Sequence, residues 1–232
     1  ETSIIYLHLS NALIQSGFIN EAEKYIDKSL DYDPENLYSE LVRIYILLAG
    51  SGDLQQTRVL LTQALQKDTS RYDIMKELGV ITYYLRDYES AYYYYQQVFD
   101  IVDAQGLNLY AGEKAKMGLI LSELGREEES KIYFQEYLDF AENDQSIYRG
   151  LSLAAYYAYM GDSAKAIEYM DQFSKQEKYP YWYVLFLGMD DPLFDNLDEL
   201  PAFKNILREI ELKFWRYNKQ IKDSLKEKGL LG

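Results

Sequence analysis

Apolar residues recur along this chain at helical spacing. In the segment SIIYLHLSNALIQSG near the start, Tyr6, Leu9 and Leu13 fall at positions i, i+3 and i+7. This spacing places side chains on one face of an α-helix and predicts that these three residues are buried together. Similar amphipathic segments follow, separated by short turns. The pattern therefore predicts pairs of helices over most of the chain.

Five of these segments share one pattern, a small residue followed four positions later by a large apolar one. The small residues lie 35, 34, 39 and 36 positions apart, which indicates a stacked helical repeat. We expect the small residue to let two antiparallel helices approach closely and the large one to pack against the next pair. The small residues are Ala22, Thr57, Ala91, Ser130 and Ala166; the large ones are Ile26, Leu61, Tyr95, Phe134 and Met170.

The helix before each of these segments has a matching pattern. The predicted core positions there are Met75, Leu78 and Gly79; Met117, Gly118 and Leu121; and Leu153, Ala154 and Tyr157. Together the two helices resemble the repeat of the tetratricopeptide (TPR) family. The resemblance implies an all-α fold, a right-handed superhelix (α-solenoid) of about five helix-turn-helix repeats with a C-terminal helical cap. The expected ranges are 3–36, 37–70, 71–108, 109–145 and 146–178 for the repeats, and 179–232 for the cap.

Two departures from regularity carry expectations of their own. The longest spacing places extra residues in DAQGLNLYAG (103–112), where we expect a lengthened helix or a loop. The run AYYYYQQVF (91–99) lies in the second helix of the third repeat. There we expect Tyr95 to be buried, Tyr92 to pair with Phe99, and Tyr93 alone to be exposed.

The cap region predicts three helices. A short apolar helix begins near Pro180, Asp191 caps another that begins at Pro192, and Pro201 opens a long one. One stripe of the long helix contains Phe203, Leu207, Ile210, Phe214, Tyr217 and Ile221. We expect this stripe to cover the last repeat, whose core is otherwise exposed.

The segment DPLFDNLDELPAFKNIL also resembles the segment that ends TPR arrays in bacterial multidomain regulators. This resemblance implies an attached N-terminal effector domain, cyclase-like or DNA-binding, with the present chain as the sensory or interaction part. The chain opens with Glu1, and we expect it to be a fragment or processed form. A cytoplasmic location fits this interpretation.

Composition narrows the partners. The net charge of -14 disfavours direct contact with nucleic acid, because such binding comes largely from lysine and arginine. No apolar run is long enough to span a membrane. Between Lys204 and Lys228 the net charge is +4, leaving -18 elsewhere. This basic stretch is either a solvated face that complements the acidic array or a docking arm for a partner or another copy.

The concave face of such an array is the expected binding surface for an extended or helical peptide. Our candidate binding residues are His8, Asn11, Arg43, Ile46, Lys76, Val80, Tyr84, Lys116, Leu119, Tyr148 and Tyr159. Some TPR arrays clamp a carboxylate tail with a lysine and asparagine set. Only Asn11 matches that set, since Leu7 and Arg43 stand where its other members are expected.

Catalytic chemistry has little support in the sequence. There is no cysteine, one histidine and no glycine-rich phosphate loop, and we expect no cofactor. The acidic group Asp190, Asp191, Asp195 and Asp198 is consistent with a cation site, but helix capping around Pro192 explains it more simply. Three hypotheses remain: a non-catalytic protein-binding scaffold, a self-association or autoinhibitory module acting through the cap, and a catalytic domain of unknown type.

Overall fold

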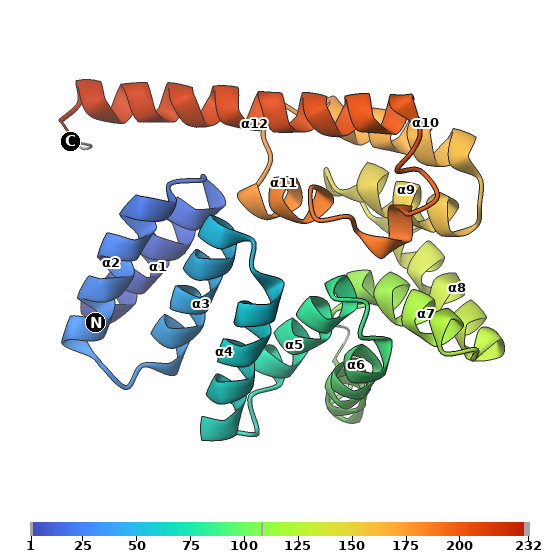
Figure 1. Ribbon diagram of the computed structural model, residues 1–232, viewed down its shortest axis with the longest axis horizontal. Coiled ribbons are helices and arrows are strands. Elements are labelled where there is room, and N and C mark those ends of the chain that lie inside the picture. Colours follow the sequence, from blue (N-terminus) through green and yellow to red (C-terminus); the bar gives the residue numbers. More distant parts are fainter. Residues whose placement is uncertain (1, 108, 230–232) are drawn as a thin grey trace.

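The computed structural model describes residues 2–107 and 109–229, which contain twelve α-helices, two short 3-10 helices and no β-strand. Ten of the helices form five antiparallel pairs that stack side by side into an α-solenoid (Figure 1). The pairs are α1 (Thr2–Gln15) with α2 (Ile19–Tyr32), α3 (Leu37–Ser51) with α4 (Leu54–Lys67), α5 (Tyr72–Tyr84) with α6 (Tyr88–Ala104), α7 (Lys114–Glu123) with α8 (Glu127–Asn143), and α9 (Arg149–Tyr159) with α10 (Ser163–Ser174).

The predicted small and large positions of the second helices are buried. All ten of these side chains are at most 3% exposed. The close approach is visible where a glycine of the first helix faces an aromatic ring. A Cβ atom at Gly79 would lie 3.0 Å from the ring of Tyr95, and one at Gly118 would lie 2.7 Å from the ring of Phe134. A side chain at Gly118 would therefore clash with the Phe134 ring, and one at Gly79 would require the Tyr95 ring to shift.

The second repeat departs from this arrangement. Gly79 and Gly118 each lie twelve positions before the small residue of their partner helix, and the position twelve before Thr57 is Tyr45. A tyrosine is too large for such a crossing. Accordingly α3 and α4 pack less closely than the helices of the other four repeats. The ring of Tyr45 turns toward the inner face of the solenoid, where it contacts Trp182.

The prediction that Tyr6, Leu9 and Leu13 of the first helix are buried together is wrong at Leu9. Leu9 is 38% exposed, whereas the buried residues of α1 are Ser3, Ser10 and Ile14. Among the described residues no further helix covers the outer side of α1, which lies at the end of the stack. Its inner side fits small hydroxyl residues, because Ser10 Oγ donates a hydrogen bond to the Ala22 carbonyl oxygen at 2.8 Å.

The irregular segment after the third repeat behaves as expected. Helix α6 is lengthened to 17 residues, and a turn and the 3-10 helix η1 (Ala111–Glu113) follow it. Residue 108 of the predicted segment lies outside the described residues. Because η1 precedes α7 directly, it places Glu113 at the inner end of the fourth repeat.

Within the tyrosine run, Tyr95 is buried and Tyr93 is 60% exposed, both as predicted. The ring of Tyr92 lies beneath the guanidinium of Arg126, whose Cζ is 4.4 Å from the ring centroid. Phe99 stacks on Tyr95 and not, as predicted, on Tyr92. Helix geometry explains the difference, because Tyr95 and Phe99 lie one turn apart on one face, whereas Tyr92 and Phe99 lie about two turns apart.

The cap consists of α11 (Tyr181–Leu187), the 3-10 helix η2 (Pro192–Phe194) and α12 (Pro201–Glu227). The three helices of the cap begin where the sequence predicts. Pro180 is the N-cap of α11, the Asp191 side chain accepts from the Leu193 amide at the start of η2, and Pro201 opens α12. In Figure 1, α12 lies along one edge of the whole stack, whereas α11 lies between α12 and the repeats.

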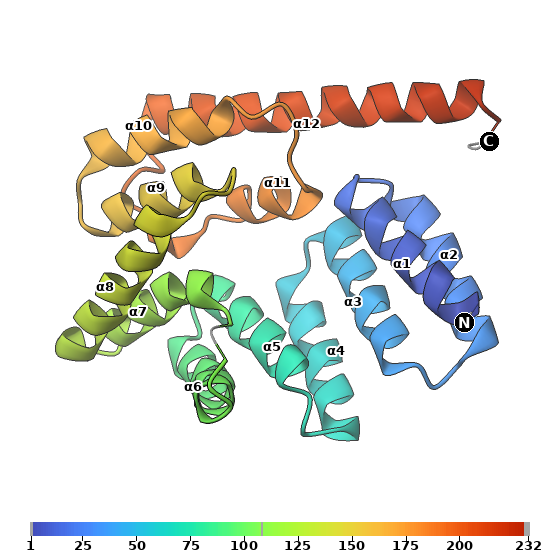
Figure 2. The ribbon, with the colours of Figure 1, turned by 180° about the vertical axis from the view of Figure 1, so that it is seen from behind.

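Helix α12 joins the last repeat to the first. Lys213 Nζ donates to the Ser174 carbonyl oxygen of α10 at 2.6 Å. Further along α12, Phe214 packs against Gly17, and Asn218 Nδ2 donates to the Ser16 carbonyl oxygen at 2.6 Å. The view from behind in Figure 2 shows the same span from α10 to the α1–α2 turn. The sequence predicted the cover over the last repeat but not the contact with the first.

Candidate functional site

Helix α11 occupies the concave face of the solenoid. Three of its aromatic residues each pair with an aromatic residue of a different repeat. Trp182 meets Tyr45 of α3 edge-on at 5.6 Å between centroids, and Phe186 stacks on Tyr84 of α5 at 4.9 Å. Tyr183 stacks on Tyr148, the residue before α9, at 4.7 Å. A two-turn helix thus contacts the second, third and fifth repeats.

The start of α11 is fixed at both the array and α12. The hydroxyl of Tyr181 donates to the Ala49 carbonyl oxygen of α3 at 3.0 Å. Its ring also lies 5.5 Å from that of Phe214 on α12. Aromatic pairs of this kind contribute about 0.5–1.5 kcal/mol each beyond the apolar area that they bury. Several pairs on one short helix explain why a segment of seven residues stays helical.

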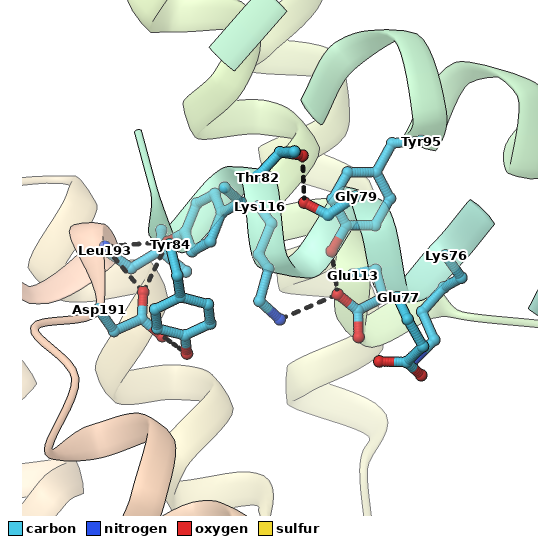
Figure 3. Close-up of polar contacts among 11 residues, drawn as sticks. Lys76, Glu77, Gly79, Thr82, Tyr84, Tyr95, Glu113, Lys116, Asp191 and Leu193 are labelled. Atoms are coloured by element: carbon cyan, nitrogen blue, oxygen red, sulfur yellow. Dashed lines mark hydrogen bonds and ion pairs between the residues drawn. The ribbon is translucent and has the colours of Figure 1, made fainter. Parts of the chain in front are cut away.

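The segment after α11 is held to α5 by hydrogen bonds (Figure 3). The carboxylate of Asp191 accepts from the Tyr83 hydroxyl at 2.6 Å and from the Tyr84 hydroxyl at 2.9 Å. Burial, and then the negative charge of Asp191, raise the pKa of both phenols well above the usual value. Both tyrosines therefore remain protonated donors throughout the physiological pH range.

Further contacts fix the same segment. Arg86, which follows the first helix of the third repeat, forms a bidentate ion pair with Asp195, with hydrogen bonds of 2.6 and 2.7 Å. Asn196 Nδ2 donates to the Ala158 carbonyl oxygen of α9 at 2.5 Å. Of the predicted acidic group, Asp191 and Asp195 therefore bind the array. No cluster that suits a metal ion occurs in residues 2–107 and 109–229.

A cavity of about 700 Å³ remains between α11 and the repeats. Its polar floor comes from α5 and the η1–α7 segment. Lys76 forms an ion pair with Glu77, and Lys116 Nζ donates to Glu113 at 2.9 Å. The Tyr95 hydroxyl also donates to Glu113, at 2.6 Å. Figure 3 shows Lys116 pointing toward Glu113 from the side of Asp191.

Electrostatics hold Glu113 and Lys76 in their charged forms. Burial alone would raise the pKa of Glu113, but the ammonium groups of Lys116 and Lys76 and the bond from Tyr95 lower it to about 2. Burial likewise opposes the charge of Lys76, yet the carboxylates of Glu77 and Glu113 raise its pKa above the usual value. The cavity floor is therefore a set of two ammonium and two carboxylate groups.

The structure brings five of the predicted binding residues together around this cavity. They are Lys76, Val80, Tyr84, Lys116 and Tyr148. The other six lie elsewhere. On the first repeat, His8 is exposed and Asn11 is half-buried. Leu119 belongs to the core of the solenoid. Tyr159 stacks on Phe134 at 3.6 Å.

The two remaining candidates lie on the side of α3 that faces the first repeat. Arg43 pairs with Asp27 on α2, and Ile46 is buried against the first repeat with Ile14 and Ala22. Tyr45 takes the groove position instead. The signal for this change was present in the sequence, because a tyrosine stands where the other repeats have serine, glycine or alanine.

Sequence reasoning missed the cap residues of the site. Trp182, Phe186 and Asp191 line the cavity but belong to a segment predicted only as cover. The aromatic richness of YWYVLFL was a usable signal, since such a helix requires a large apolar surface to cover it. Glu113 was missed because the longer third repeat hid its position.

Parts of the sequence and the fold have counterparts among known proteins. Residues 4–36 and 115–144 match the tetratricopeptide repeat. A comparison with curated proteins finds no match. The solved structure of Pseudomonas aeruginosa pilF is similar with a TM-score of 0.52 and 16% identity, over 94% of this chain and 97% of that one. Two structures of MamA AMB-1 align with 75% of this chain and with 90% and 98% of theirs, at 17% and 18% identity and TM-scores of 0.47 and 0.48.

These findings define the fold. The chain is an α-solenoid of stacked helix pairs, and two stretches of it are similar to tetratricopeptide repeats, an architecture whose concave surface commonly binds other proteins. Within the described residues no helix is both long and apolar enough to cross a membrane.

Proposed function

We propose that this chain is a non-catalytic scaffold whose protein partner binds the concave face through a short aromatic or aliphatic helix. One observation carries the proposal: the concave face already holds such a helix, α11, through Tyr45, Tyr84 and Tyr148. A surface that orders seven residues of its own chain has the shape and chemistry to order a similar segment of another protein.

The polar residues of the groove would set the orientation of the bound partner helix. Lys76 and Lys116 face the groove beside Glu77 and Glu113, and all four are held in fixed positions by one another. A partner helix with a polar residue one turn after its aromatic anchors would reach this set. Such a contact favours one orientation of the bound helix.

The role in a larger protein is a separate proposal. The resemblance of residues 191–207 to the closing segments of bacterial multidomain regulators supports a sensory or interaction part of a cytoplasmic regulatory protein, with an effector domain attached at the N-terminus. Within that arrangement, partner binding on the concave face would be the input.

A second candidate function is autoinhibition through the cap. The observation that favours it is that α11 and a partner helix need the same three tyrosines. A partner must therefore displace α11, and the groove is closed until it does. Exchange of α11 between two copies would give self-association by the same contacts.

A labelled peptide with the sequence of residues 179–189 tests both candidates. In the full chain, the double change Trp182→Ala and Phe186→Ala removes the anchors of α11 and leaves the groove residues intact. Fluorescence anisotropy should show tight peptide binding to this variant and weak binding to the unchanged chain. Adding Tyr45→Ala and Tyr84→Ala should abolish the binding.

A matched control changes two exposed aliphatic residues, Val59→Ala with Ile132→Ala, and should leave peptide binding as weak as in the unchanged chain. Peptide binding that is indifferent to the loss of Tyr45 and Tyr84 would remove the concave face from the proposal. Tight binding to the unchanged chain would support the scaffold and contradict autoinhibition.

A further inference from the structure

The space left beneath α11 has the size of a small-molecule site. Its volume of about 700 Å³ lies within the range of roughly 300–1,000 Å³ that is usual for ligand pockets. Helix α11 forms one wall, and the first helices of the repeats form the opposite one. The cavity therefore exists only while α11 is docked, although its repeat side is the same surface as the proposed partner groove.

Aromatic rings form much of the wall. Tyr84 and Phe186 lie on one side, Tyr148 and Tyr183 on another, and Trp182 completes the α11 face. The stacked pairs have interplanar angles of 27° and 13°. Stacking covers one face of each of these rings. The rest of such an aromatic lining suits apolar groups, and any ring face left open attracts cations and disfavours anions.

The charged lining is also negative. Four carboxylates, Glu77, Glu113, Asp144 and Asp191, face two ammonium groups. Glu77 and Glu113 are neutralised by Lys76 and Lys116 in the ion pairs described above.

The other two carboxylates have no cationic partner among the described residues. Asp191 accepts from two tyrosine hydroxyls and the Leu193 amide. Asp144 accepts only from the amide and hydroxyl of Ser146. The two lysines thus balance the charges of Glu77 and Glu113, and the described part of the lining has no further cation to balance Asp144 and Asp191.

We infer that this cavity binds an organic cation, an amine or quaternary ammonium group on an apolar body. Asp191 supplies the counter-charge, and the aromatic side chains that line the cavity contact the apolar part. An anionic ligand would have to break the Lys116–Glu113 pair, and a neutral one would leave both carboxylates uncompensated. The bound cation also fastens α11 to the repeats, so it opposes entry of a partner helix.

Three probes that share one ring test the charge preference: benzyltrimethylammonium, benzyl alcohol and sodium benzoate. Isothermal titration calorimetry on the full chain should show binding of the cation at millimolar concentrations or below. The neutral and anionic probes should bind about tenfold more weakly or not at all, a difference of about 1.4 kcal/mol that cation–π and charge contributions readily supply. Equal affinity for all three probes, or no binding of the cation, would overturn the inference.

Variants locate the site. Asp191→Asn and Asp144→Asn should each lower the affinity for the cation several-fold, and Phe186→Leu should do so while it keeps the apolar volume. Asp198→Asn is the matched control, because Asp198 belongs to the same acidic segment but does not line the cavity. Should Asp191→Asn fail to fold, Asp144→Asn and Phe186→Leu carry the test. An unchanged affinity in these two variants would place the cation elsewhere and contradict the assignment.

Discussion

The carboxylate of Asp191 accepts a hydrogen bond from the hydroxyl of Tyr84, 107 positions earlier in the chain, at 2.9 Å. This bond joins the cap to the middle of the solenoid. The same carboxylate accepts from Tyr83, whose side chain is fully buried. One residue of the cap thus satisfies two phenols that would otherwise face a low-dielectric interior.

Replacement of Asp191 by alanine should therefore destabilise the fold. Loss of the acceptor leaves the Tyr83 hydroxyl buried with one partner fewer, which costs about 1–3 kcal/mol. Urea unfolding followed by circular dichroism measures the change. Asp198→Ala serves as the control, and we expect it to be neutral or slightly stabilising, because burial and the charge of Asp195 already raise the Asp198 pKa. Equal losses in the two variants would contradict the role of the Tyr83 and Tyr84 bonds.

The crossing at Gly118 gives a steric prediction. A methyl group there would lie 2.7 Å from the Phe134 ring, which is buried and stacked on Tyr159. Gly118→Ala should lower the free energy of unfolding by about 1–3 kcal/mol. At Gly112 the nearest atom to such a methyl group is 3.8 Å away, so Gly112→Ala should change it little. A Gly118→Ala protein as stable as the parent would show that the two helices have room to separate.

Some of these features could be predicted from the sequence and others could not. The repeat pattern predicted the crossings, because each depends on residues close in the chain and on a fixed helical spacing. It also predicted Lys76, Val80 and Tyr84 on one groove, since the interval of four positions places them on one helix face. The loose packing of α3 against α4 depends on the volume of a single residue, Tyr45, and periodicity does not encode volume.

The position of α11 was harder still to predict. Its contacts with Tyr45 and Tyr84 join segments more than a hundred residues apart, and an apolar segment of seven residues fits many surfaces. Its hydrophobic pattern indicates burial but not the surface that buries it. The same holds for Phe214, which was expected on the last repeat and also contacts Gly17 in the first turn.

Acid should weaken the cavity floor. The pKa of Glu113 falls from 4.5 to about 2 on folding, so its charged form is the one that the fold stabilises. The corresponding stability, about 3 kcal/mol, is present above pH 4.5 and is lost as the pH falls toward 2. Glu113→Gln should remove this part of the pH dependence and lower stability at pH 7. Urea midpoints measured from pH 7 to pH 3 check the prediction, and identical slopes for parent and variant would contradict it.

The closure between α12 and the first repeat depends on Phe214. Its side chain is 2% exposed and packs against Gly17 and the Tyr181 ring. Phe214→Ala should cost about 3–5 kcal/mol and increase hydrogen exchange in the α1–α2 turn. Leu212→Ala, at a site 54% exposed on the same helix, should leave exchange there unchanged. Unaltered exchange in the Phe214 variant would mean that α12 does not hold the first repeat.

The tyrosine run should tolerate change at its exposed member. Tyr93 is 60% exposed, so Tyr93→Glu should alter the free energy of unfolding by less than about 0.5 kcal/mol. Peptide binding to the groove should also be unchanged, because Tyr93 does not line the cavity. A marked loss of partner binding in this variant would assign a function to the convex face.

Helix α11 occupies the concave groove, and its tryptophan reports on this position. The chain contains two tryptophans, Trp182 in α11 and Trp215 on α12. The side chain of Trp215 is 41% exposed. Trp215→Phe leaves Trp182 as the only tryptophan reporter. Acrylamide quenching of its fluorescence measures directly whether α11 is covered. The structure predicts a quenching constant several-fold lower in the native protein than in urea, and equal constants in the two states would contradict the account.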